Sequence, residues 1–187
     1  MRSFIPTTAC DRNAAEHDAS RLPRWKRELA AAITDPAVLC RELRLPTAVA
    51  EAARRAERNF RTLVPRPFLK RMRPGDPNDP LLRQVLPVPA ETEPVEGYSA
   101  DPLGEREACR SPGVLQKYRN RSLIVLTRGC PVHCRYCFRR HFTPSPSPID
   151  AVRRGGTPPS PLVAAADDPS IHEIILSGGE PLMIDNA

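Results

Sequence analysis

Residues 122–140 read SLIVLTRGCPVHCRYCFRR, an apolar run followed by three cysteines and a group of basic residues. The run Ser122–Thr127 is rich in β-branched residues and ends at a glycine turn, which is typical of a buried parallel strand. A second such run, IHEIILSGG, spans Ile171–Gly179. A strand, a functional loop, a helix and a second strand with its loop form the repeat of a parallel barrel. The sequence therefore predicts an α/β fold whose functional loops follow the strands.

Upstream of this stretch, the pattern predicts two or three amphipathic helices. Apolar residues recur at helical spacing over Trp25–Ile33 and Val38–Leu43, and a helical segment spans Thr47–Leu63 behind a proline. Residues 73–105 are crowded with Pro, Asp and Gly, so they form either a surface linker or a strap that fixes the helices onto the following domain. We expect three regions, namely a disordered N-terminus at 1–21, a helical extension with a Pro-rich strap at 22–112, and a core at 113–187.

Length limits how much of a barrel the chain can contain. The chain has 187 residues, of which only the last 50 follow Cys137. A complete eightfold barrel needs roughly 200 or more residues. At most two strand units fit, so we expect the first part of a parallel (β/α) barrel that is incomplete in this chain. The uncovered sheet edges that would result favour a chain truncated at its C-terminus.

Composition argues against several classes of protein. The sequence has neither an apolar stretch of about 18 residues nor a secretory signal, so it predicts no membrane partner. The formal net charge is +6 but only 5% of residues are aromatic, so a nucleic-acid partner is not expected. Three of the six cysteines fall within eight residues, which suits a metal or redox cluster in a reducing compartment. We therefore expect a cytoplasmic protein.

The clustered cysteines are Cys130, Cys134 and Cys137, and no fourth cysteine lies nearby. Thiolates bind soft metals. A structural zinc site normally has four ligands, so His133 or His141 would have to complete it. A [4Fe–4S] cluster with three cysteine-ligated irons and one open iron fits the spacing better, and an open iron can bind a substrate or cofactor. The sequence predicts the cluster and leaves zinc as the alternative.

The spacing of the cysteines resembles that of radical S-adenosylmethionine enzymes. The resemblance includes the aromatic residue before the third cysteine and the turn Gly178-Gly179-Glu180 after the next strand. The strings CRYCFRRHF (134–142), GDPNDPLLRQVLP (75–87) and PGVLQKYRNR (112–121) are further similar to those of the lysine 2,3-aminomutase family. Within that family they look most like the members that make (R)-β-lysine for the modification of elongation factor P.

The resemblance implies an isomerase that converts L-α-lysine to (R)-β-lysine. It implies three cofactors, a [4Fe–4S] cluster, S-adenosylmethionine and pyridoxal 5′-phosphate, and an electron donor such as flavodoxin or ferredoxin. Residues 113–187 would be the N-terminal part of a radical S-adenosylmethionine barrel. No lysine follows Lys117, so the Schiff-base lysine of the family would lie beyond Ala187. No catalytic residue is therefore assigned, and this chain alone is expected to be inactive.

The resemblance also assigns binding residues. They are Tyr136, Ser177, Gly178, Gly179 and Glu180 for S-adenosylmethionine, Lys117, Tyr118 and Arg121 for the phosphate of pyridoxal phosphate, and Arg139 for the substrate carboxylate. Glycines let a backbone approach a ligand closely, and a carboxylate can accept hydrogen bonds from an ammonium group. Arg140 and His141 would not contact the substrate directly.

Several alternatives stay open at this point. Tyr136 packs against adenine or is a buried structural tyrosine, and residues 117–121 form a phosphate site or a solvated basic turn. The function could also be that of another 2,3-aminomutase acting on free lysine, arginine or glutamate. A metal-binding or nucleic-acid-binding module without enzymatic activity is the remaining alternative.

Overall fold

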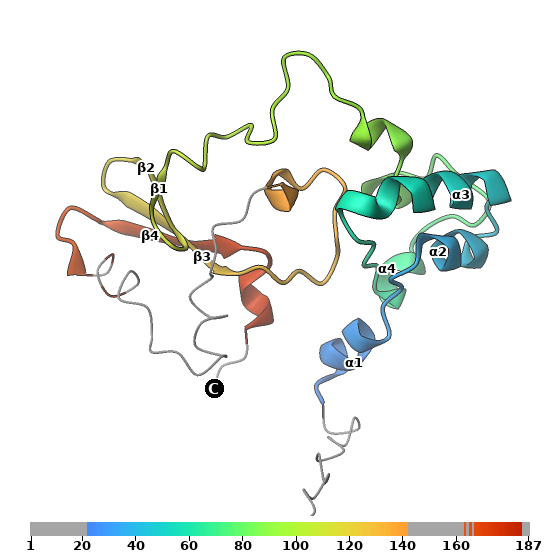
Figure 1. The fold of residues 1–187 in the computed structure, drawn as a ribbon. Helices are drawn as coiled ribbons and strands as arrows, with labels where there is room; N and C mark the ends of the chain where they lie inside the picture. Colours follow the sequence, from blue (N-terminus) through green and yellow to red (C-terminus); the bar gives the residue numbers. More distant parts are fainter. Residues whose placement is uncertain (1–21, 142–162, 164, 166, 185–187) are drawn as a thin grey trace, which may run out of the picture.

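The computed structural model describes residues 22–141, 163, 165 and 167–184. Helices lie on one side of the molecule and a sheet on the other (Figure 1). Residues 128–137, which we call the cysteine loop, run between them and carry the three clustered cysteines. The fold is mixed α/β, with N-terminal helices and an open sheet, as far as the described residues extend.

The N-terminal region forms four short α-helices, α1 (Arg24–Ala30), α2 (Pro36–Glu42), α3 (Thr47–Ala56) and α4 (Arg66–Leu69). Asp35 caps the N-terminus of α2, because its carboxylate accepts a hydrogen bond of 2.7 Å from the backbone N–H of Ala37. The 3-10 turns are η2 (Glu57–Asn59), η3 (Leu82–Gln84), η4 (Pro89–Thr92), η5 (Phe138–Arg140) and η6 (Pro181–Met183).

Two of the predicted helices are shorter than the sequence suggested. The backbones of Ile33 and Val64 pair in an antiparallel bridge, with N–H···O distances of 2.8 and 2.9 Å. Phe60 is already extended, and the N–H of Thr62 donates to the carboxylate of Glu57 at 2.7 Å. The expected helices ending at Ile33 and Leu63 were therefore wrong at their C-terminal ends, because a tertiary backbone pairing competes with the local helical preference.

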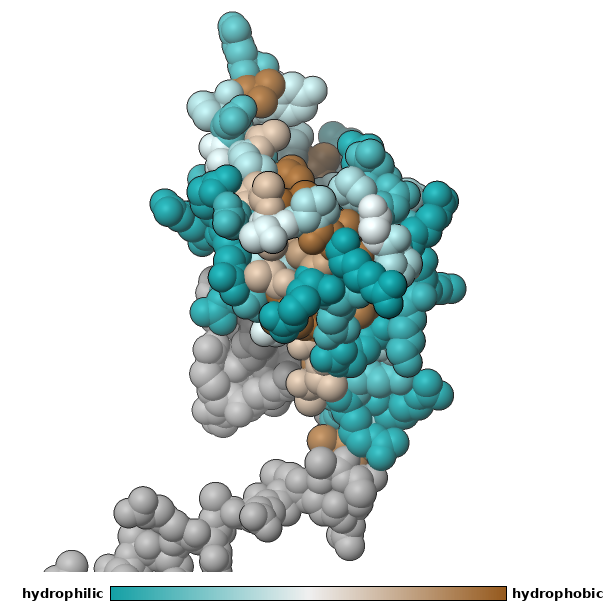
Figure 2. All heavy atoms as spheres, turned by 90° about the vertical axis from the view of Figure 1, so that its right-hand side faces the viewer, coloured by the Kyte–Doolittle hydropathy of each residue, from teal (hydrophilic) through white to brown (hydrophobic). Residues whose placement is uncertain are grey.

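The helices close around one apolar core. Leu39, Val64, Leu82 and Val85 are fully buried in it. Leu82 and Val85 belong to the Pro-rich segment, so residues 82–86 are part of the fold and the interpretation as a surface linker is wrong there. On the outer face of this helical side, hydrophilic side chains flank a strip of hydrophobic ones (Figure 2).

The sheet has four strands, β1 (Cys109–Ser111), β2 (Val114–Tyr118), β3 (Arg121–Thr127) and β4 (Glu173–Gly178), in that order. The strands β3 and β4 confirm the two predicted runs and pair in parallel, with Ile124 beside Leu176. The strands β1 and β2 were not predicted and pair antiparallel, so the sheet is mixed. Asn120 makes the turn into β3 with a left-handed φ of 63°.

The strand β4 is not buried, which corrects the expectation for this run. Ile174, Ile175 and Leu176 are 38%, 36% and 56% exposed, whereas Ile124 of β3 is 1% exposed. Within the described residues, β4 is the edge strand of the sheet, and its apolar side chains are only partly covered.

The predicted disordered N-terminus at 1–21 falls outside the described residues, as do residues 142–162. Val163, Ala165 and Asp167 are helical, in agreement with the short helix expected before the second strand. No helix among the described residues is long and apolar enough to cross a membrane.

Candidate functional site

The cysteine loop and the end of β4 line a cavity of about 500 Å³, which we call the cysteine cavity. The predicted site residues on its wall are Cys130, Cys134, Cys137, Tyr136, Arg139, Gly178 and Gly179. The structure thus brings the cysteines and the glycine turn to one cavity, although they are about 40 residues apart in the chain.

The glycine turn holds the end of β4 against the start of the cysteine loop. The N–H of Gly179 donates to the carbonyl of Thr127 at 2.7 Å, and the N–H of Glu180 donates to the carbonyl of Gly129 at 2.8 Å. A Cβ atom on Gly178 or Gly179 would lie less than 3.0 Å from one of these two carbonyl oxygens. Any side chain at these two positions would therefore clash with a backbone carbonyl, so glycine is required there. The sequence analysis did not anticipate this reason.

Glu180 and Ser177 flank this turn. One carboxylate oxygen of Glu180 accepts a 3.0 Å hydrogen bond from the N–H of Leu182 and so caps η6. The charge of Glu180 also contributes to the raised pKa of the Cys130 thiol, so the carboxylate lies near the cysteines. Ser177 accepts a 2.9 Å hydrogen bond from Arg139. Contacts of Ser177 and Glu180 with S-adenosylmethionine stay predictions.

The three thiols are close enough to influence one another. Burial raises the pKa of Cys130 most, followed by the negative charges of Cys137 and Cys134. Cationic iron would remove this repulsion between thiolates. Across residues 22–141, 163, 165 and 167–184, no three His, Cys, Asp or Glu side chains converge on a single metal ion. Three thiolates on the wall of one cavity suit a soft metal such as iron.

Of the two histidines proposed as a fourth zinc ligand, His133 lines the cysteine cavity together with the three cysteines. The Nδ1 atom of His133 lies 2.8 Å from the carbonyl oxygen of Arg61, so this nitrogen carries the proton. The His133 ring stacks on Phe60, with centroids 4.9 Å apart. His141 lines a different cavity, beside Glu91 and Tyr98. The placement of His141 therefore separates it from the three cysteines, whereas His133 stays beside them.

Tyr136 is an exposed residue of the cavity wall. Its side chain is 70% exposed, so the alternative of a buried structural tyrosine is wrong. A hydrogen bond to Cys134, and then the charge of that thiolate, raise the pKa of the Tyr136 hydroxyl. The predicted contact between its ring and adenine stays a prediction.

Glu91 is a residue of the site that the sequence analysis missed. Its carboxylate accepts hydrogen bonds from Arg135 at 2.6 Å and from Arg140 at 2.7 Å. Burial raises the pKa of Glu91, but hydrogen bonds from the two arginines outweigh burial and leave the pKa below its usual value. Glu91 lies in η4, within the Pro-rich segment, so it joins this strap to the residues on either side of Cys137.

Arg139, predicted to bind the substrate carboxylate, is bound to a carboxylate of the protein. Its Nε and Nη2 atoms donate to the two oxygens of the buried Glu105 at 3.0 and 2.7 Å. Its Nη1 atom reaches Ser177 and the carbonyl of Gly178. Arg139 therefore links the strap, η5 and β4, and any other carboxylate would have to displace Glu105. Glu105 was likewise not singled out from the sequence.

The residues predicted to bind the phosphate lie together on the hairpin of β2 and β3. Lys117, Tyr118 and Arg121 line a separate cavity of about 100 Å³. Lys117 donates to the carbonyl of Leu103, and Arg121 pairs with Glu173. Two cations and a hydroxyl around one cavity suit a phosphate. Glu105 also lines this cavity, and its charge is balanced by Arg139.

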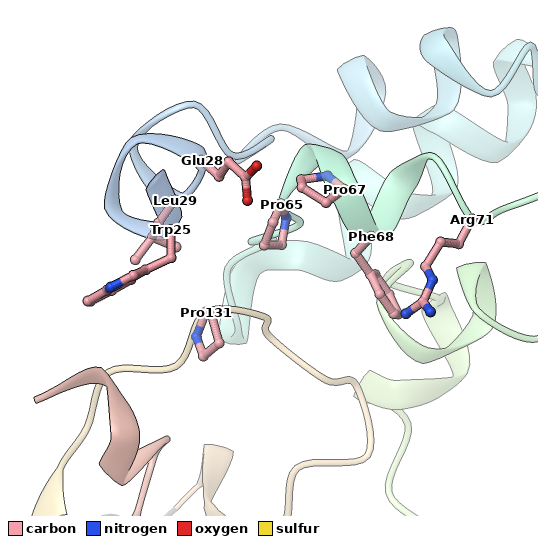
Figure 3. A pocket seen from close by; sticks show the side chains of 8 residues that line it. All are labelled: Trp25, Glu28, Leu29, Pro65, Pro67, Phe68, Arg71 and Pro131. Carbon is pink, nitrogen blue, oxygen red and sulfur yellow. The ribbon is translucent and has the colours of Figure 1, made fainter. Parts of the chain in front are cut away.

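Backbone hydrogen bonds join the cysteine loop to the helical side. The N–H of His133 donates to the carbonyl of Leu63 at 3.0 Å, and the N–H of Arg135 donates to the carbonyl of Gln84 at 2.7 Å. Figure 3 shows a further cavity, of about 330 Å³, where Pro131 of the cysteine loop faces Trp25 of α1. None of the predicted site residues lines this cavity.

Comparison with known proteins identifies the class of the cluster-bearing part. Residues 118–187 match the family model of a 4Fe-4S single cluster domain. This match covers β3, the cysteine loop and β4, so the predicted cluster domain is confirmed.

Longer matches extend over the helical side as well. The chain is 43% identical over 160 residues to the L-lysine 2,3-aminomutase of Escherichia coli, which covers 85% of the chain and 45% of that protein. It is 41% identical over 159 residues to the L-lysine 2,3-aminomutase of Haemophilus influenzae, which covers 85% of the chain and 46% of that protein. The chain belongs to the lysine 2,3-aminomutase family and spans a little under half the length of these relatives.

Proposed function

We propose that this protein is an isomerase of the radical S-adenosylmethionine type that converts L-α-lysine to (R)-β-lysine for the modification of elongation factor P. The observation that carries the proposal is the cysteine cavity, where three cysteines meet the glycine turn in a chain 43% identical to an L-lysine 2,3-aminomutase. The same proposal names L-lysine as substrate and flavodoxin or ferredoxin as electron donor.

Three separate groups of residues bind the three cofactors. Cys130, Cys134 and Cys137 hold a [4Fe–4S] cluster, and the wall from Tyr136 to the glycine turn binds S-adenosylmethionine. Lys117, Tyr118 and Arg121 hold the phosphate of pyridoxal phosphate in the neighbouring cavity. When bound, the cluster and S-adenosylmethionine supply a hydrogen-abstracting radical and pyridoxal phosphate carries the amino group. Arg139 and Glu105 lie between the two cavities and orient their shared wall.

Cluster binding is tested first, with the 187-residue chain. Anaerobic reconstitution with iron and sulfide is expected to give the EPR signal of a reduced [4Fe–4S] cluster. Replacing Cys130, Cys134 or Cys137 by Ser should abolish it, because each thiolate holds one iron. Cys109→Ser is the matched control, since Cys109 is exposed and lies in β1. Tight binding of zinc without iron would contradict the proposal.

The substrate is tested with the full-length gene product that contains these residues. The reduced protein, loaded with cluster, S-adenosylmethionine and pyridoxal phosphate, is given L-lysine, L-arginine or L-glutamate. We expect β-lysine from lysine and no β-amino acid from the other two, measured by chromatography and mass spectrometry. Faster formation of β-arginine or β-glutamate would favour the alternative aminomutases.

A further inference from the structure

Another cavity, of about 680 Å³, lies on the helical side next to the cysteine cavity. The charged residues on its wall are the three arginines Arg54, Arg58 and Arg61 and one acid, Glu57, and we call it the basic cavity. Arg54 belongs to the last turn of α3, Arg58 belongs to η2, and Arg61 follows shortly after. Their charges are therefore gathered at one place on the surface.

Two of these arginines have no charged partner among the described residues. Arg54 pairs with Asp35 at 2.9 Å. The half-buried Glu57 accepts a hydrogen bond of 2.7 Å from a backbone N–H. Arg58 and Arg61 are exposed, and neither forms an ion pair with any residue that the structure describes. The basic cavity therefore presents an excess of positive charge to the solvent.

His133 connects the basic cavity to the predicted cluster. It lines both the basic cavity and the cysteine cavity. Its Nδ1 atom donates to the carbonyl of Arg61 at 2.8 Å, and in the chain it directly precedes Cys134. A molecule bound in the basic cavity would therefore lie against His133, one residue from a proposed ligand of the cluster.

We propose that the basic cavity is the docking surface for an acidic one-electron donor protein of the flavodoxin or ferredoxin type. The inference rests on the proposed function, which requires a reduced cluster. One electron passes from the reduced donor to the oxidised cluster, so the donor is oxidised by one electron and the cluster reduced by one, and no bond or proton changes place.

The chemistry of the surface fits such a partner. Interfaces between electron-transfer proteins are small, and complementary charge steers the two proteins together. Arg58 and Arg61 supply exposed positive charge for an acidic partner. Because His133 lines both cavities, a donor docked there also lies close to the cluster site, which shortens the path of the electron.

Docking is measured first, without any cluster. Calorimetric titration of the 187-residue chain with oxidised flavodoxin, and separately with oxidised ferredoxin, gives the dissociation constants at low and high ionic strength. The test variant is Arg58→Glu/Arg61→Glu. Its control, Arg27→Glu/Arg110→Glu, makes the same change in net charge at two exposed arginines outside the basic cavity. Circular dichroism checks folding, and the single changes Arg58→Glu and Arg61→Glu give the same comparison if the double variant unfolds.

We expect at least one donor to bind at low ionic strength and to be released as salt is added, because salt screens exposed charges. The test variant should bind about 10-fold more weakly or worse, and the control should bind like wild type. Equal weakening in both variants, or wild-type protein that binds neither donor, would overturn the proposal. Tighter binding of a single-stranded RNA than of either donor would assign the surface to nucleic acid and overturn it as well.

Electron transfer is then measured on the reconstituted cluster by stopped-flow absorbance. Reduction by the donor that binds should slow in the test variant by about the factor lost in binding. Reduction by photoreduced deazariboflavin, which is small and uncharged, should keep its wild-type rate. Slowing with both reductants would place the defect at the cluster and contradict docking. Failure of the proposed function is seen separately, as absence of the cluster in iron and sulfide analysis, which leaves the binding measurements unaffected.

Discussion

The helical side and the sheet side of the molecule hold the cysteine loop by different means. The helical side offers a closed core around Leu82 and a buried carboxylate, Glu91, that binds two arginines of the cysteine motif. The sheet side offers the close backbone contact of Gly178 and Gly179, while Leu176 of β4 stays 56% exposed. The loop is therefore fixed by buried charge and apolar packing on one side and by backbone fit on the other.

The two sides contribute unequally to the stability of the site. Apolar burial and paired buried charges on the helical side are formed entirely by described residues. The strand β4 still presents apolar side chains that the described residues cover only in part. We expect changes on the helical side to affect folding, and changes at the glycine turn to affect mainly the geometry of the cluster site.

The largest effect is expected from Glu91→Gln. This change leaves the buried guanidinium groups of Arg135 and Arg140 without their charged partner, which should cost about 3–5 kcal/mol. Urea unfolding followed by circular dichroism measures the loss. The exposed neighbour Glu93 provides the control, and Glu93→Gln should unfold like wild type. Equal stability of the two variants would mean that the buried cluster of charges does not support the loop.

A core substitution on the helical side comes next. Leu82 is 0% exposed, so Leu82→Ala should destabilise the protein by about 2–5 kcal/mol through lost burial and a residual cavity. Leu176→Ala on β4 should change stability by no more than about 0.5 kcal/mol, because this side chain is largely exposed. Both are measured by denaturant unfolding. A larger loss in Leu176→Ala would show that β4 is covered in solution.

The sheet side is tested at the glycine turn. Gly179→Ala places a Cβ against the carbonyl of Gly129, so a backbone must move at a cost of about 1–3 kcal/mol. The expected result is a lower yield of reconstituted cluster with a smaller loss of stability than in Glu91→Gln. In Gly129→Ala the new Cβ would meet Thr127 at an ordinary 3.5 Å, so cluster yield should stay near that of wild type. Unchanged cluster yield in Gly179→Ala would contradict the role of the turn.

The stability of the helical side is expected to depend on pH through Glu91. The pKa of Glu91 is lower in the folded protein than its usual value, because hydrogen bonds from Arg135 and Arg140 outweigh burial. Its contribution is therefore complete above the ordinary glutamate pKa of about 4.3 and is lost as the pH falls through the lower folded pKa. Unfolding midpoints measured from pH 6 downward should fall more for wild type than for Glu91→Gln. If the unfolding midpoints of the two proteins fall equally with pH, Glu91 is not the cause of the pH dependence.

The smallest effect is expected at the surface of the helical side. Arg54 pairs with Asp35 at 2.9 Å, and both side chains are largely solvated. Arg54→Gln should leave the unfolding midpoint within experimental error, because exposed ion pairs contribute little. Asp35→Ala should lower the midpoint further, since it also removes the cap of α2. A large effect of Arg54→Gln would show that surface charge supports this side after all.

Much of the fold could be predicted because its signals are local. The β-branched run of β3 and the spacing of the three cysteines each lie within eight residues, so periodicity and motif suffice. The hairpin of β1 and β2 was missed, because short strands with mixed polarity resemble a turn-rich segment. The burial of β4 was predicted wrongly, because an apolar run does not reveal what packs against the two faces of its sheet.

The spacing of the three cysteines was enough to predict the cluster domain, because closely spaced thiolates limit the ligands that can bind there. Which carboxylates hold the arginines depends on long-range contacts of the fold. Glu91 and Arg135 are 44 residues apart, and Glu105 and Arg139 are 34 residues apart, so no local pattern connects them. Their pairing follows from burial, because a charge removed from water must find a partner wherever the fold places one.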